Sequence, residues 1–126
     1  MRVLFAAPDA TLRSLFGMVL RDAGYEAMEA WTGVEAWGLL DLQGADFCVL
    51  DTGLRLMSTL ELARRIRASS RFPGLPIILV ADTEPSEEER AAFSKAGVKD
   101  WLAKPVEPPT LLKALTAPSG NAATAV

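Results

Sequence analysis

The sequence contains no histidine, and it has one cysteine among its 126 residues. Without histidine the chain has no imidazole acid or base, no histidine phosphoacceptor, and none of the side chains that most often bind zinc or iron. The single cysteine, Cys48, lies in an apolar run and cannot form an internal disulfide. We therefore interpret it as a small buried residue of a central strand, in a protein from a reducing compartment.

Long apolar runs are also absent. The first one, residues 3–7, is too short for a signal peptide or a membrane span. The net charge is -3 and the 13 cationic residues are scattered, which argues against a nucleic-acid surface. Half of the residues are hydrophobic and 23% are charged, as in an ordinary globular domain. We expect one cytoplasmic domain, residues 1–117, that binds neither nucleic acid nor membrane, followed by a flexible tail, residues 118–126.

Short apolar runs alternate with helical periodicity along the chain. Residues 3–6, 47–50 and 77–81 predict buried strands, and residues 25–30 and 101–103 predict weaker ones. A helix is predicted after each strand. The apolar positions predicted to form the buried face of the first helix are Leu12, Leu15, Phe16, Val19, Leu20 and Ala23. Val34, Trp37 and Leu40 are the apolar residues of the second helix.

Helix ends carry their own signals. Asp9 precedes the first helix as an N-cap, and Ser86 with Glu89 forms a capping box before the fourth. Five strands alternating with five helices predict a doubly wound α/β sandwich with a parallel sheet. In such sheets the functional site lies where the strands end, and those ends carry the residues Ala7, Pro8, Asp9, Asp51, Gly53, Ala81, Asp82 and Lys104.

Asp51 and Lys104 are the strongest chemical signals among these residues. A carboxylate at the end of a strand can act as a nucleophile toward a phosphoryl group. A lysine at a neighbouring strand end can neutralise the charge that this group brings. Either residue alone is a weak signal, but the pair in this order on this fold is specific.

These residues lie in stretches that resemble the receiver domain of two-component response regulators, from Arg2 to about Leu115. The stretches that carry the resemblance are residues 45–51, 60–67, 75–78 and 96–105. The resemblance implies a flavodoxin-like (βα)5 fold with strand order 2-1-3-4-5 and a phosphate on Asp51, donated by a sensor histidine kinase. It also implies that Lys104 contacts the phosphoryl group, that the aromatic switch residue Trp101 changes rotamer on activation, and that Mg²⁺ is the cofactor.

The chain departs from the family at several of these positions. The usual acidic pair falls on Ala7 and Pro8, so that only Asp9 is acidic, and the switch hydroxyl falls on Ala81. Arg55 and Thr59 replace a usual proline and glycine. With Asp51 beside Lys104 alone, we expect a nearly neutral pocket that binds magnesium weakly through Asp51 and Gly53, and slow phosphoryl transfer.

Alternatives exist for three single residues. Asp9 is a possible substitute metal ligand, but we prefer its role as an N-cap. Asp82 is a candidate partner of Lys104, and we favour a solvated turn residue. Trp31 is interpreted as an ordinary surface aromatic rather than a partner contact, and Trp37 as a core residue.

The sequence predicts an atypical receiver that signals through protein–protein contact and is not an enzyme. Its partners would be a sensor histidine kinase or another signalling protein, or a second copy bound through the last two helices and the strand between them. The alternative is a working phosphoacceptor.

The run Asp51-Thr52-Gly53 also matches aspartic proteases, but the helical periodicity contradicts their all-β fold. A flavodoxin-like cofactor enzyme lacks support, because no phosphate-binding loop follows the first strand.

Overall fold

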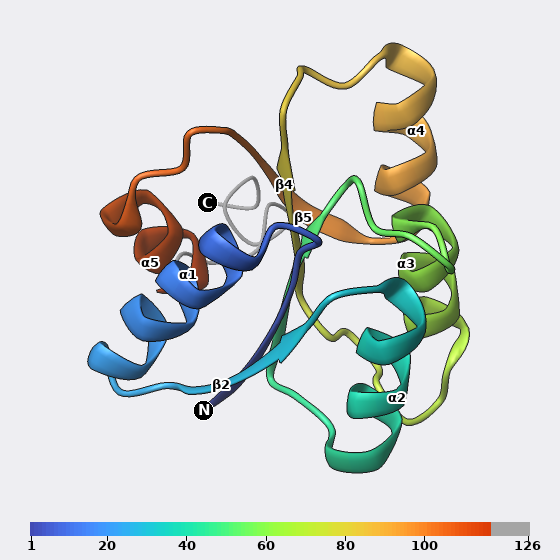
Figure 1. The fold of residues 1–126 in the computed structure, drawn as a ribbon. Helices are drawn as coiled ribbons and strands as arrows, with labels where there is room; N and C mark the ends of the chain where they lie inside the picture. The colour runs from blue at the N-terminus through green and yellow to red at the C-terminus, as the bar shows by residue number, and fades with distance from the viewer. Residues whose placement is uncertain (117–126) are drawn as a thin grey trace.

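The computed structural model describes residues 1–116, in which five strands alternate with five helices (Figure 1). The strands are β1 (Arg2–Ala6), β2 (Glu26–Ala30), β3 (Phe47–Asp51), β4 (Ile77–Ala81) and β5 (Val98–Ala103). The helices are α1 (Ala10–Asp22), α2 (Gly33–Gln43), α3 (Thr59–Ala68), α4 (Glu87–Lys95) and α5 (Pro108–Thr116). The predicted tail, residues 118–126, lies outside the described residues.

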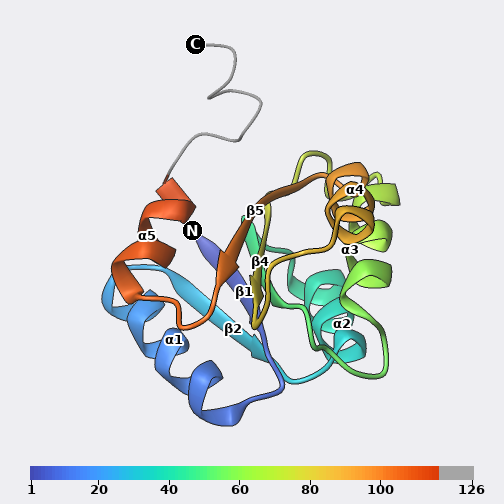
Figure 2. The same cartoon turned by 90° about the horizontal axis from the view of Figure 1, so that it is seen from above.

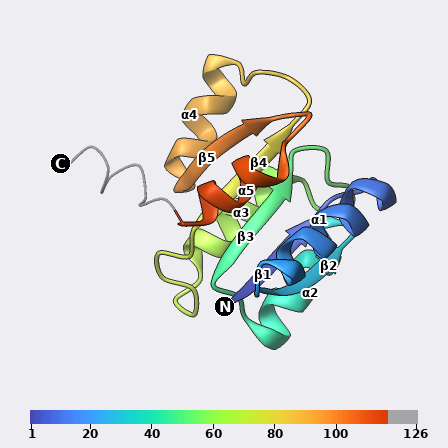
Figure 3. The same cartoon turned by 90° about the vertical axis from the view of Figure 1, so that its left-hand side faces the viewer.

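All strand pairs are parallel and their order is β2-β1-β3-β4-β5, which confirms the predicted topology. Helices α1 and α5 lie side by side on one face of the sheet, and α2, α3 and α4 cover the other face (Figures 2 and 3). No helix within residues 1–116 is long and apolar enough to cross a membrane.

The three central strands are apolar on both sides because both faces of the sheet are covered. Alternate residues of β1 enter different cores: Leu4 packs with α2, α3 and α4, whereas Phe5 packs with α1 and α5. Cys48 is fully buried, as predicted, and burial raises the pKa of its thiol to about 12, against a smaller lowering by the charge of Arg67. A thiol with this pKa is inert at neutral pH.

The predicted buried face of the first helix is partly wrong. Leu15 is 48% exposed and Ala23 is exposed, whereas Arg13 and Gly17 are buried. The buried face is rotated because Glu29, on the neighbouring β2, lies against the helix next to Gly17. In the second helix Val34 is likewise 51% exposed, and Trp37 is only partly buried, packed edge-to-face against Phe72.

Two strand boundaries also differ from the prediction. β5 begins at Val98, three residues earlier than predicted, and its register with β4 shifts between Ile77 and Ile78. β2 begins at Glu26 rather than at Tyr25. Both strands lie at sheet edges, where polar residues are tolerated and the apolar pattern is weak.

The predicted helix caps are confirmed. Asp9 Oδ1 accepts a hydrogen bond from the backbone N–H of Leu12 at 3.0 Å. Ser86 and Glu89 form both hydrogen bonds of a capping box at the start of α4. The Asp9 side chain is therefore engaged as the N-cap of α1.

Candidate functional site

The site lies at the carboxyl ends of β3, β4 and β5, which are neighbours in the sheet. Lys104 follows β5, and its backbone N–H donates to the carbonyl of Ala81, the last residue of β4. Its side chain then reaches β3, where Nζ lies 2.5 Å from Oδ2 of Asp51. The parallel order thus brings together two residues that are 53 positions apart in the sequence.

Asp51 is 4% exposed and is held at three points. Its Oδ1 accepts the backbone N–H of Gly53 at 2.7 Å, and its Oδ2 pairs with Lys104. Its backbone carbonyl accepts the hydroxyl of Thr59, the first residue of α3, at 2.6 Å. Oδ1 is therefore hydrogen-bonded, whereas the buried Oδ2 has the ion pair with Lys104 but no hydrogen bond within residues 1–116. The Thr59 bond ties the strand end to the following helix.

Lys104 has a second carboxylate beside it, because Asp82 Oδ1 lies 3.5 Å from its Nζ. The prediction that Asp82 is only a solvated turn residue is wrong in this respect, although its side chain is 80% exposed. Burial by itself lowers the pKa of Lys104, but the close pairing with the Asp51 carboxylate and the nearby charge of Asp82 outweigh burial and raise it. The pocket holds two carboxylates and one ammonium, so it is not the neutral pocket that was predicted.

The end of β1 contributes no carboxylate to this pocket. Ala7 is fully buried with the apolar side chains beneath α1 and α5, and Pro8 is exposed. Asp9, the nearest acid in the sequence, caps α1. Across residues 1–116 there is no group of three or more His, Cys, Asp or Glu side chains that could hold a metal ion. Asp51, already paired with Lys104, and the backbone of Gly53 would supply few of the six oxygen ligands of Mg²⁺, and water would have to supply the rest.

The sequence interpretation missed Arg13, which is 8% exposed and lies beside the end of β1. Its Nη1 donates to the carbonyl of Ala7 at 2.8 Å, and its guanidinium lies 5.2 Å from the ring centroid of Trp31. Glu29 faces the same guanidinium at 4.0 Å. Trp31 is 62% exposed, but it has this cationic partner and is not an isolated surface aromatic. The arginine itself was visible in the sequence, but only the β1–β2 pairing brings its partners to it.

The two switch positions of the family, one for a hydroxyl and one for an aromatic residue, are Ala81 and Trp101 in this chain. Ala81 is 1% exposed and carries no hydroxyl. Trp101 is half-buried, and its ring packs edge-to-face on Phe93 of α4 with the centroids 5.6 Å apart. Its indole N–H donates to the carbonyl of Thr83, in the loop between β4 and α4, at 3.3 Å. Trp101 therefore connects β5 with the loop between β4 and α4, which begins at the site.

Comparison with known proteins identifies the family of this chain. The family model of the response regulator receiver domain matches residues 3–116. The chemotaxis protein CheY1 of Helicobacter pylori is 37% identical over 118 residues, covering 91% of this chain and 94% of the relative. A CheY homologue of Campylobacter jejuni is 32% identical, covering 91% and 89%.

Solved structures give the same result. Chemotaxis protein CheY4 of Vibrio cholerae superposes with a TM-score of 0.84 at 31% identity, covering 90% of this chain and 94% of that one. A response regulator of Chloroflexus aurantiacus gives 0.81 at 30% identity, covering 90% and 93%. The chain belongs to the response regulator receiver family, and it is a CheY-like receiver domain of two-component signalling.

Proposed function

We propose that this chain is an atypical receiver, which signals through protein–protein contact with weak or no magnesium-dependent phosphorylation of Asp51. One observation carries the proposal: the Asp51 carboxylate is paired with Lys104, while the end of β1 supplies Ala7 and Pro8 where the family has acids. The metal normally offsets the negative charge that develops in phosphoryl transfer. Without carboxylates at the end of β1 to hold that metal, transfer should be slow.

The switch position supports the same proposal. A phosphoryl group shifts a two-state equilibrium only by the difference between its contacts in the two states. In the family the switch hydroxyl supplies part of this difference, and Ala81 has none. A phosphoryl group on Asp51 would therefore bias the states less, however firmly it was attached.

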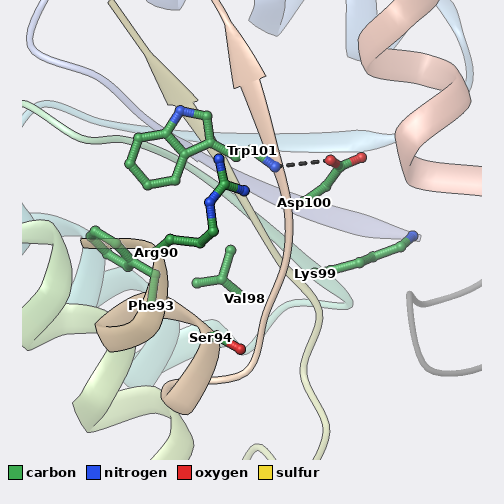
Figure 4. A pocket seen from close by; sticks show the side chains of 7 residues that line it. All are labelled: Arg90, Phe93, Ser94, Val98, Lys99, Asp100 and Trp101. Atoms are coloured by element: carbon green, nitrogen blue, oxygen red, sulfur yellow. Dashed lines mark hydrogen bonds between the residues drawn. The ribbon is translucent and has the colours of Figure 1, made fainter. Parts of the chain in front are cut away.

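The surface proposed to meet a partner is formed by α4, β5 and α5. It carries a cavity of about 300 Å³ lined by Arg90, Phe93, Ser94, Val98, Lys99, Asp100 and Trp101 (Figure 4). Trp101 packs against Phe93 at this cavity and is fixed by its bond to Thr83. Tryptophan and arginine are over-represented among the residues that dominate binding energy at protein interfaces. The partner would be a sensor histidine kinase or another cytoplasmic signalling protein, or a second copy of this chain.

A complementation assay in a strain lacking this gene tests the proposal. Asp51→Asn should retain most of the wild-type phenotype, because output does not depend on a phosphate there. Trp101→Ala should lose it, because the partner surface is damaged. Loss of function in Asp51→Asn, with normal expression and folding, would contradict the proposal.

A second candidate function is a working phosphoacceptor that tolerates a poor metal site. The retained pair of Asp51 and Lys104 favours it, since these are the nucleophile and the phosphate-contacting lysine of the family. In that case Asp51→Asn abolishes output, and a cognate kinase transfers phosphate to the wild-type chain but not to this variant.

A further inference from the structure

A cavity of about 370 Å³ lies between α3 and α4, at the ends of these helices that point away from Asp51. The two helices lie side by side in the layer that covers one face of the sheet (Figures 1 and 2). The residues that line the cavity are Arg64, Arg67, Ala68, Lys95 and Ala96. Three of the five are cations and none is a carboxylate. In a chain with a net charge of -3, this concentration of positive charge requires an explanation.

Arg67 has a structural role that accounts for its own position. Its Nε donates to the carbonyl of Ala96 at 2.9 Å, and its Nη2 donates to Leu75 at 2.7 Å and to Gly97 at 3.3 Å. Gly97 leaves room for the guanidinium, because a Cβ there would lie 2.6 Å from Nε. Arg67 thus satisfies carbonyls at the end of α4 and is held rigidly at the wall of the cavity.

Arg64 and Lys95 have no such role. Both are exposed, and within residues 1–116 neither makes a hydrogen bond or ion pair through its side chain. The adjacent Arg65, by contrast, pairs with Glu61 at 3.3 Å. A cation near a helix C-terminus is favourable, but Arg67 already contacts the free carbonyls there. Two positive charges therefore remain uncompensated beside a third that is fixed in place.

We propose that this cavity binds a small phosphorylated anion, separate from any phosphoryl group on Asp51. Arginine offers a planar array of donors that matches phosphate oxygens, and lysine adds a point charge. The small side chains of Ala68 and Ala96 leave the space between the cations open. Arg67 joins α3 to the turn before β5, so the anion would bridge the helix that follows Asp51 and the partner surface.

The test is isothermal titration calorimetry of the full chain with inorganic phosphate and with pyrophosphate, without magnesium. The site variant is Arg64→Gln/Lys95→Gln. The control is Arg55→Gln/Lys113→Gln, which removes the same charge from an exposed arginine and an exposed lysine outside the cavity. We expect the site variant to bind at least about tenfold more weakly than wild type, with little change in the control.

Amide chemical shifts locate the anion. Shifts at residues 64–68 and 95–97 support the proposal, whereas shifts confined to residues 51–53 and 104 place the anion at Lys104 and overturn it. Absence of binding to wild type, or an equal loss in the control variant, also overturns it. The substituted side chains are exposed, and circular dichroism verifies that both variants fold.

Discussion

Leu56 is a strained residue whose replacement by glycine should stabilise the protein. It lies in the loop between β3 and α3 with a φ of 69°, the only positive φ of a non-glycine residue within residues 1–116. Its side chain is 83% exposed and contributes almost no buried apolar area. The backbone therefore adopts a conformation suited to glycine without compensation from packing.

The size of the effect follows from three terms. A side chain in the left-handed region costs about 1–2 kcal/mol, which glycine removes. Glycine loses more backbone entropy on folding, which costs about 0.5–1 kcal/mol. The exposed Leu56 side chain offers little hydrophobic stabilisation to lose. We expect Leu56→Gly to raise the free energy of unfolding by about 0–1.5 kcal/mol.

Urea unfolding, followed by circular dichroism and extrapolated to water, measures this change. Leu42→Gly is the matched control, because Leu42 is 80% exposed and lies within α2, where it has an ordinary helical backbone. That change should lower the free energy of unfolding by about 0.5–1 kcal/mol. If Leu56→Gly destabilises the protein as much as Leu42→Gly does, the reasoning from backbone strain is refuted.

Further predictions concern the surroundings of Asp51. Thr59→Val removes the hydroxyl that donates to the Asp51 carbonyl and should lower the free energy of unfolding by about 1–2 kcal/mol, whereas Thr59→Ser should lower it less; urea unfolding distinguishes them. Because the pKa of Lys104 is raised in the folded state, the charged lysine stabilises the fold. This stabilisation is complete below the unfolded-state pKa of about 10.4 and is lost as pH rises through the folded-state pKa. Wild-type stability should therefore decline more steeply in this alkaline range than that of Lys104→Met, and equal slopes would contradict the account. Magnesium followed by tryptophan fluorescence should not saturate in the sub-millimolar range; saturation there would mean that Asp9 or Asp82 has been recruited as a ligand.

The fold was predictable because its signals are local and repeated. Fully apolar strands such as residues 47–50 imply a sheet covered on both faces, and the capping box at Ser86 fixes a helix start. The core strands and caps were therefore predicted nearly to the residue. β5 was predicted too short because Lys99 and Asp100, on an edge strand, interrupt its apolar pattern.

The site was predictable only in part. The resemblance to receivers placed Asp51 and Lys104 together, and the structure has them in contact. The role of Thr59 and the cluster at Arg13 depend on which residues the fold brings close in space. Thr59 was visible as an unusual residue, but its bond to the Asp51 carbonyl follows from the return of the chain into α3. Contacts of this kind are not encoded in sequence spacing.

Asp51 should be a poor phosphoacceptor, because the end of β1 lacks acids. Intact-mass spectrometry after incubation with acetyl phosphate and magnesium tests it directly, with Asp51→Asn as the blank. A comparison chain restores the acids as Ala7→Asp/Pro8→Asp, and Pro8→Asp alone serves if burial at position 7 prevents folding. Wild type should gain little or no phosphoryl mass under conditions in which the restored chain is labelled. Stoichiometric phosphorylation of wild-type Asp51 would contradict it.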